Sequence, residues 1–240
     1  MVRNDRRTRL LPKILFGQSI VAFIVILMSL GVIFYAEGYR FDFSTFRVVK
    51  TGVLYLKFQP RNVTISVNDL RQEESSSFVE NLTPGLYHVS VDKSGYVSWK
   101  LGLQVRSQSV NEFSDIILFR SKIPVSDLTD PDKIGILTEP TEVLASNAPD
   151  QLLYNEYEIW VGNQLVTRFA SPVQGAVWYP DLAHIVYQQG KEIRLIESNG
   201  QNDTALVKLS SDTPTIFAIG SRGSELYFQD DGKYKMAKIR

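Results

Sequence analysis

The residues that decide the fold are Ile14–Ala36, ILFGQSIVAFIVILMSLGVIFYA, an apolar run without a charged side chain. At a helical rise of roughly 1.5 Å per residue, its roughly 23 positions extend about 34 Å, more than the roughly 30 Å hydrocarbon core of a bilayer. A helix satisfies its backbone polar groups internally, and this property lets it cross lipid. The run therefore predicts one transmembrane helix over residues 14–36.

The basic residues on either side of this run set its expected orientation. Residues 1–13 are strongly basic, whereas basic and acidic residues nearly balance over residues 37–50. Because flanking positive charge stays on the cytoplasmic side, we expect a cytoplasmic tail at 1–13 and an extracytoplasmic position for the rest of the chain. The residues that determine this topology are Arg3, Arg6, Arg7, Arg9 and Lys13. A cleaved signal peptide is the competing interpretation, but its apolar region spans only about 7–15 residues.

Aromatic residues end and follow the apolar run. They are Tyr35, Tyr39, Phe41, Phe43 and Phe46. Aromatic side chains gather at the level of the lipid headgroups, so these residues fit a belt at the outer surface of the membrane. The alternative is that some of them belong to the core of the next domain.

The composition limits the chemistry open to this chain of 240 residues. The formal net charge is zero and cysteine is absent, so disulfides and thiolate metal sites are excluded. About 200 residues follow the apolar run, enough for one or two domains held by packing alone. The basic tail is explained by topology and by anionic lipid, so we expect no nucleic-acid partner. These features are compatible with a bacterial cell envelope.

Residues 47–120 alternate apolar and polar side chains, which is the period of a half-buried strand. The alternating apolar residues are Leu54, Leu56 and Phe58, then Val63, Ile65 and Val67, then Tyr87, Val89 and Val91. Turn residues separate such runs at intervals of about 8–12 residues, the spacing of a small β-sandwich. We therefore expect a β-sandwich over residues 47–120.

The same region resembles the PEGA domain, a small extracytoplasmic β-sandwich of prokaryotic envelope proteins. The matching residues are Gly52, Leu54, Leu56, Phe58, Pro60, Val63, Ile65, Val67, Leu82, Pro84, Gly85, Tyr87, Val89, Val91, Gly95, Tyr96 and Trp99. The sequence departs from the family after Pro60, where Arg61-Asn62-Val63 stands in place of Glu-Gly-Ala. The resemblance implies surface or wall-related binding or scaffolding, and it supplies no catalytic residues.

The second half of the chain repeats itself. Residues 121–140 contain several prolines and acids and are expected to form a linker. Beyond them, residues 141–240 show about three similar sets of apolar strands, with equivalent positions recurring at roughly 33 and 40 residues. The dipeptides Asn199-Gly200 and Asp231-Gly232 favour tight primed hairpin turns. The pattern predicts stacked antiparallel units of about four strands each.

The middle repeat resembles a blade of the TolB-type β-propellers. The residues that carry this resemblance are Trp178-Tyr179-Pro180-Asp181, Ile185-Val186-Tyr187, Ile193 to Ile196, and Asn199-Gly200. The other repeats lack the Pro-Asp element, and three blades are fewer than an ordinary ring contains. Either the chain is part of a longer protein or its strands form an open stack. The expected fold is therefore mainly β: one transmembrane helix, a small PEGA-like β-sandwich and a partial, propeller-like set of antiparallel sheets.

Few residues offer reactive chemistry. We expect His88 on the solvated face of its strand, and we expect His184 to pair with Asp181 at a turn rather than to act in catalysis. The acidic pairs Glu73-Glu74 and Asp230-Asp231 are expected to be solvated in hairpin loops. The remaining acidic group, which lacks the rest of a calcium loop, comprises Asp127, Asp130 and Asp132. We therefore predict no catalytic residue, no metal site and no cofactor.

Two aromatic residues are the best candidates for contact with a ligand, namely Trp178 and Tyr179. Core packing is the alternative for both, and Tyr179, beside Pro180, is the one expected to be exposed. A rigid exposed aromatic side chain can stack on a sugar or anchor a peptide.

These features predict a single-pass, membrane-anchored extracytoplasmic protein of a prokaryotic cell envelope that binds or scaffolds without catalysis. Its expected partners are the lipid bilayer and either a cell-wall or surface glycan or an envelope protein. One alternative is a sensory or assembly ectodomain that acts through a membrane partner. A second is a cell-wall-active hydrolase, in which His184 is the catalytic group to test.

Overall fold

The computed structural model of the chain describes residues 5–43, 46–71, 77–138 and 150–240. The described part of the chain is mainly β, with two helices among its many strands, which confirms the expected class. Its described strands form several antiparallel sheets, and none of these sheets closes into a barrel. The chain divides into two compact units. The first comprises Met1–Tyr55, Phe78–Leu86 and Gln104–Glu112, and the second comprises Leu56–Ser77, Tyr87–Leu103 and Phe113–Arg240.

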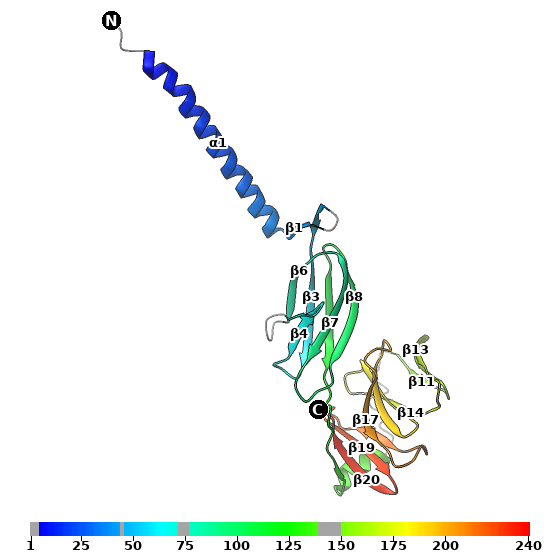
Figure 1. Ribbon diagram of the computed structural model, residues 1–240. Coiled ribbons are helices and arrows are strands. Elements are labelled where there is room, and N and C mark those ends of the chain that lie inside the picture. Colours follow the sequence, from blue (N-terminus) through cyan, green and yellow to red (C-terminus); the bar gives the residue numbers. More distant parts are fainter. Residues whose placement is uncertain (1–4, 44–45, 72–76, 139–149) are drawn as a thin grey trace. The chain divides into compact units, whose positions relative to one another are not determined.

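The apolar run forms one long helix in the first unit. Helix α1 spans Asp5–Ala36 and therefore begins before the expected start at residue 14 (Figure 1). Its segment Phe16–Ala36 is 21 residues long, has a mean hydropathy of 2.6 and is not buried against any described part of the chain. This length and composition suffice to span a membrane. The basic residues expected to set topology lie outside the described side chains; they are Arg3, Arg6, Arg7, Arg9 and Lys13.

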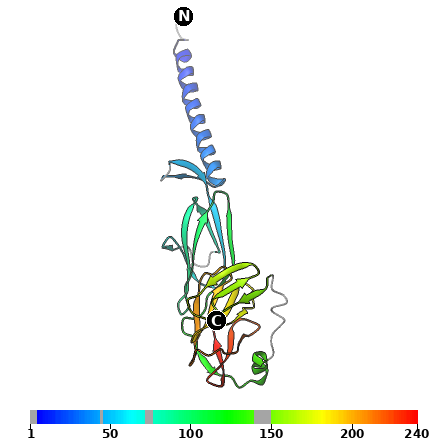
Figure 2. The same cartoon turned by 90° about the vertical axis from the view of Figure 1, so that its right-hand side faces the viewer.

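A two-stranded hairpin follows the helix directly. Strand β1 (Tyr39–Asp42) pairs antiparallel with β2 (Arg47–Lys50), with Tyr39 opposite Lys50. Figure 2 shows this hairpin next to the end of α1. The chain thus returns to the end of the helix before the larger sheets begin.

The strands from residue 52 to residue 117 form two antiparallel sheets, with the orders β6-β3-β9 and β5-β4-β7-β8. Their bounds are β3 (Gly52–Gln59), β4 (Thr64–Val67), β5 (Leu70–Arg71), β6 (Phe78–Leu82), β7 (Gly85–Asp92), β8 (Trp99–Val105) and β9 (Val110–Ile117). Side chains along these strands alternate as the sequence predicts. Val89 and Val91 of β7 are buried, whereas His88, which precedes Val89, is exposed.

Three separate antiparallel sheets follow and correspond to the three sequence repeats. Their orders are β11-β12-β13, β14-β15-β16-β17 and β10-β20-β19-β18. The bounds are β11 (Leu152–Tyr154), β12 (Glu158–Val161), β13 (Gln164–Arg168), β14 (Val173–Trp178), β15 (His184–Gln189), β16 (Glu192–Glu197), β17 (Thr204–Lys208), β18 (Phe217–Ile219), β19 (Glu225–Asp230) and β20 (Lys233–Lys238). Two of the three sheets therefore have the expected four strands, and the first described sheet has three.

The segment expected to be a linker contains two regular elements. Strand β10 (Val125–Asp127) pairs with β20 and supplies the fourth strand of the last sheet. Helix α2 (Pro131–Thr138) follows, and the Asp130 carboxylate accepts a hydrogen bond from the Asp132 amide at its N-terminus. Proline at the first helical position needs no donor there, so the prolines that suggested a linker are compatible with these elements. Pairing with β10 also covers an edge that β20 would otherwise expose.

One of the two predicted primed turns is present. At Asp231-Gly232 both residues have positive φ, 51° and 71°, and the turn joins β19 directly to β20. At Asn199-Gly200 only the glycine has positive φ, 83°, and the connection from β16 to β17 runs over residues 198–203. The prediction of a two-residue turn there is wrong, because the Asn199 side chain instead accepts a hydrogen bond from the Gln201 amide and widens the loop.

Two apolar clusters form the core around β15. Val186 packs in a cluster with Leu195 and Phe228, and Tyr187 packs in the other cluster with Trp178. Adjacent residues of one strand point to opposite faces of its sheet. Strand β15 is therefore covered by apolar side chains on both faces.

Candidate functional site

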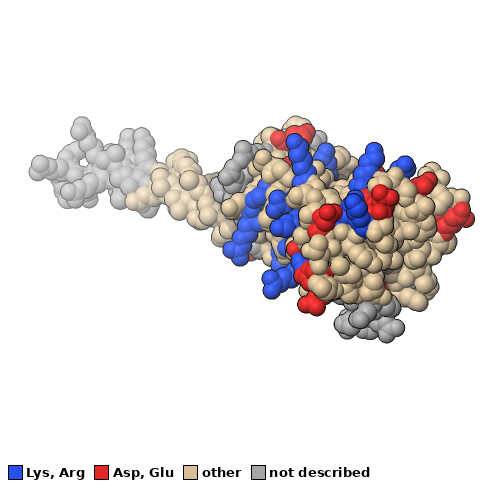
Figure 3. Space-filling model, turned by 90° about the horizontal axis from the view of Figure 1, so that it is seen from below, with Lys and Arg blue, Asp and Glu red and all other residues tan. Residues whose placement is uncertain are grey.

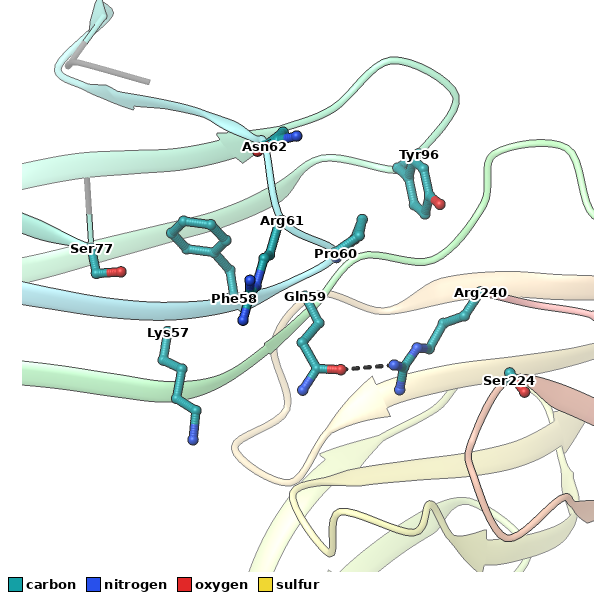
Figure 4. A pocket seen from close by; sticks show the side chains of 10 residues that line it. All are labelled: Lys57, Phe58, Gln59, Pro60, Arg61, Asn62, Ser77, Tyr96, Ser224 and Arg240. Carbon is teal, nitrogen blue, oxygen red and sulfur yellow. Dashed lines mark hydrogen bonds between the residues drawn. The ribbon is translucent and has the colours of Figure 1, made fainter. Parts of the chain in front are cut away.

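A pocket of about 800 Å³ lies within the second unit, at the end of β3 (Figure 4). The residues that line it are Lys57, Phe58, Gln59, Pro60, Arg61, Asn62, Ser77, Tyr96, Ser224 and Arg240. They come from four regions: the end of β3 with its turn, the loop of Ser77, the loop of Tyr96, and the residues next to β19 and β20, Ser224 and Arg240.

The turn after β3 forms one wall of the pocket, and hydrogen bonds to its backbone carbonyl oxygens hold it in place. The Gln59–Pro60 peptide is cis and Asn62 has a φ of 61°. The Lys93 Nζ donates to the carbonyl oxygens of Arg61 at 2.6 Å and of Asn62 at 3.0 Å. The Leu118 amide donates to the Gln59 carbonyl oxygen at 2.8 Å. These bonds fix the direction in which the turn presents its side chains.

Arg240 forms the facing wall and is held by the residue before it. The Ile239 amide donates to the Ser224 carbonyl oxygen and its own carbonyl accepts from the Arg120 amide, both at 3.0 Å. The Arg240 guanidinium donates to Gln59 Oε1 at 2.7 Å, the bond that Figure 4 draws. It also donates to the Tyr179 hydroxyl at 3.3 Å. Among the described residues, the guanidinium of Arg240 is therefore oriented by two neutral acceptors.

The pocket is basic. Lys57, Arg61 and Arg240 line it, and no lining residue has an acidic side chain. Within the described parts of the chain, none of these three basic groups forms a salt bridge. Elsewhere charges mix: the surface drawn in Figure 3 carries both basic and acidic side chains. A pocket lined by three basic side chains is suited to an anionic group such as a phosphate or a carboxylate.

The described lining contains three hydroxyl groups, those of Ser77, Ser224 and Tyr96, and no histidine or carboxylate side chain. Histidine and carboxylate are common bases for the activation of a hydroxyl nucleophile. Over the described residues, no group of three histidine, cysteine or acidic side chains is placed to hold a metal ion.

His184 pairs with Asp181 as the sequence predicts. The His184 Nδ1 lies 2.6 Å from Asp181 Oδ2, and the Asp181 Oδ1 accepts from the Ala183 and His184 amides. Burial alone would raise the pKa of Asp181, but the hydrogen bonds from His184 and the backbone lower it below its ordinary value. The imidazole is only 2% exposed and lies edge-on to Phe119 and Tyr179. The cavity beside it measures about 20 Å³, room for no more than a water molecule.

The prediction that Tyr179 is exposed is wrong. Its side chain is 1% exposed and its hydroxyl donates to the Gly223 carbonyl oxygen at 2.6 Å. Burial raises the pKa of this phenol, although Arg240 opposes the effect. Trp178 is also buried, within the cluster around Tyr187. Both candidate stacking residues therefore pack in the core, and the Pro180 that suggested exposure lies in the turn beyond them.

The other acidic candidates either form hydrogen bonds within the fold or lie outside the described residues. Glu73 and Glu74 fall in the segment that the structure does not describe. Asp230, expected to be solvated, is buried and accepts from Lys235 Nζ at 2.7 Å and from the Ser210 amide at 2.8 Å. Asp230 is the last residue of β19, and the tight turn begins only at the next residue, Asp231.

Sequence reasoning missed the basic pocket. The available signal is Arg61, where the sequence departs from the PEGA tetrapeptide and places a cation at a turn. Lys57 and Arg240 carry no local signal. They meet only after the C-terminal residues return to the end of β3.

No family model matches the chain, and no curated protein matches it. The class of ligand that the pocket accepts is therefore inferred from its lining residues.

Proposed function

We propose that this chain is a single-pass membrane protein whose β-rich part lies outside the cytoplasm and binds or scaffolds an anionic cell-wall or surface glycan, without catalysis. The observation that carries the membrane anchor is the Phe16–Ala36 segment, which is apolar, long enough to span a bilayer and not buried by any described residue. Apolar side chains left bare over this length are stable in lipid and costly in water.

Two features support the proposed domain types. The buried and exposed alternation in the sheets of β3 to β9 supports a PEGA-like sandwich. The three successive sheets after residue 150 support a propeller-like stack, in which β10 completes the last unit. Both domain types are used for binding through their surfaces and loops, and this use agrees with a scaffold.

The ligand class follows from the pocket. Guanidinium groups bind phosphate and carboxylate through paired hydrogen bonds, and the hydroxyl groups of Ser77, Ser224 and Tyr96 add neutral donors. Envelope glycans that bear phosphate or carboxylate groups offer this chemistry. The pocket therefore selects an anionic polymer over a neutral one.

The binding test compares two triple variants of the full-length chain in lipid nanodiscs. Lys57→Gln, Arg61→Gln and Arg240→Gln together remove the pocket cations, whereas Lys100→Gln, Lys122→Gln and Lys208→Gln remove three exposed lysines elsewhere in the same unit. We expect the pocket variant to lose about tenfold or more in binding to isolated cell walls, because each charge-assisted bond contributes about 1.5–3 kcal/mol. Equal losses in both variants would contradict a specific pocket.

The orientation is tested with single cysteines, since the chain has none of its own. A membrane-impermeant maleimide should label Leu70→Cys, which is 71% exposed in the wild type, on intact cells. It should label Thr8→Cys only after the cells are permeabilised. The reverse pattern would place the β-rich part in the cytoplasm.

A further inference from the structure

The β1–β2 hairpin exposes a cluster of phenylalanine side chains. Phe41, Phe43 and Phe46 are 47%, 78% and 79% exposed. Their rings nevertheless contact one another: the Phe41 centroid lies 5.0 Å from that of Phe43 and 6.2 Å from that of Phe46. Val48 of β2, which is 62% exposed, adds to the apolar surface. Contiguous apolar groups of this kind on a small element mark a contact surface.

The hairpin is attached firmly to the end of α1. The Tyr39 ring lies edge-on to Phe34, with centroids 5.2 Å apart. The Arg40 guanidinium stacks 3.6 Å above the Tyr35 ring and donates to the carbonyl oxygens of Tyr35 and Tyr39. It also donates to Asn81 Oδ1 of β6 at 2.7 Å. These contacts hold the phenylalanines near the point where the apolar helix ends.

We propose that the β1–β2 hairpin is a second membrane contact, in which Phe41, Phe43 and Phe46 insert into the outer interfacial layer of the bilayer beside α1. This inference rests on the proposed membrane anchor. Lipid is the occupant because the hairpin directly follows the spanning segment: α1 ends at Ala36, three residues before Tyr39, and Tyr39 and Arg40 contact the last turn of the helix. Aromatic side chains are enriched at this depth.

The charges of the hairpin agree with lipid headgroups as the surrounding medium. Arg47 is exposed, and the Lys50 ammonium lies 4.8 Å from the centre of the Tyr39 ring. Basic side chains next to inserted aromatic rings can form charge-assisted hydrogen bonds with lipid phosphate groups. Two contacts, helix and hairpin, then fix the rotation of α1 in the bilayer, which one helix alone leaves free.

The test uses the full-length chain in vesicles with one introduced cysteine that carries an environment-sensitive fluorophore. Val48→Cys reports on the hairpin. Val125→Cys, on an exposed valine of β10, is the matched reference. Lipids brominated in their acyl chains quench a fluorophore that enters the membrane. We expect about threefold or greater quenching at position 48 relative to position 125, since interfacial aromatic side chains reach the acyl boundary.

A second variant separates insertion from simple proximity. Phe41→Ser, Phe43→Ser and Phe46→Ser together should reduce quenching at position 48 to the level of position 125, while the protein stays in the vesicles through α1. If the wild-type protein resists carbonate extraction but shows equal quenching at positions 48 and 125, the hairpin does not contact the membrane. The membrane anchor would still stand. Position 48 shielded from both brominated lipid and aqueous iodide would also overturn it, since a protein surface then covers the cluster. Release of the wild type by carbonate would instead refute the anchor itself.

Discussion

Helix α1 and strand β15 are both apolar, yet the apolar part of the helix is exposed and the strand is buried. None of the 21 residues from Phe16 to Ala36 is buried, whereas five of the six residues of β15 are buried. The strand is short and supplies alternate side chains to two clusters, Val186 to one and Ile185 and Tyr187 to the other. The helix is too long and too uniformly apolar for a core of this size. An apolar segment must therefore be shielded from water, and its length indicates whether a protein core or a lipid bilayer shields it.

The largest expected effect compares a leucine from each region. Leu195 is 2% exposed in the cluster of Val186, and Leu27 of α1 is 52% exposed. Leu195→Ala should lower the free energy of unfolding by about 2–5 kcal/mol through lost burial and a residual cavity. Leu27→Ala should change it by less than about 0.5 kcal/mol. Denaturant titration of the full-length chain in detergent measures both, and similar losses would remove the distinction between the two regions.

A charge in the helix should affect insertion instead of folding. Ile24→Arg places a cation within the apolar segment, at a cost of about 2.5–3.5 kcal/mol near the membrane centre. We expect a reduced membrane-integrated fraction in cells. Ile216→Arg, at a position 42% exposed in the C-terminal region, is the control and should leave that fraction unchanged. An unchanged fraction for Ile24→Arg would argue that α1 does not lie in lipid.

Two glycines near the C-terminus share a backbone conformation but differ in the space that a Cβ atom would have. Gly223 and Gly232 both have positive φ, 68° and 71°, so alanine is strained at either position. A Cβ at Gly223 would also clash with the Tyr179 hydroxyl, whereas a Cβ at Gly232 meets nothing within 4 Å. Gly223→Ala should therefore destabilise by about 1–3 kcal/mol more than Gly232→Ala. Equal unfolding midpoints would show that Tyr179 is not fixed by its bond to Gly223.

The smallest expected effect is a dependence on pH. The pKa of Asp181 is lower in the folded chain than its ordinary value, so folding favours the carboxylate. Its stabilising contribution is complete above the unfolded pKa of about 3.9 and is lost as the pH falls through the lower folded pKa. Asp181→Asn should lose about 1–2 kcal/mol near neutral pH and show a shallower decline of unfolding free energy below about pH 4. Identical acid profiles for the two proteins would contradict this origin.

The elements with local patterns were predictable from the sequence. The apolar helix, the alternating strand residues such as Val89 and Val91, and the pairing of His184 with Asp181 all follow from neighbours within a few positions. The three C-terminal sheets follow from the repeat.

The features that depend on long-range contact were not predictable in this way. Tyr179 is buried, and its hydroxyl donates a hydrogen bond to the carbonyl oxygen of Gly223, in the loop between β18 and β19. Strand β10 forms because β20, distant in sequence, offers it an edge. The basic pocket likewise needs Arg240 to reach Gln59, a contact that no local pattern encodes.

Alkaline carbonate extraction of membranes that contain the full-length chain distinguishes a helix α1 that lies in lipid from one that does not. We expect the protein to stay in the membrane pellet after washing. Recovery of the intact chain in the supernatant would contradict it.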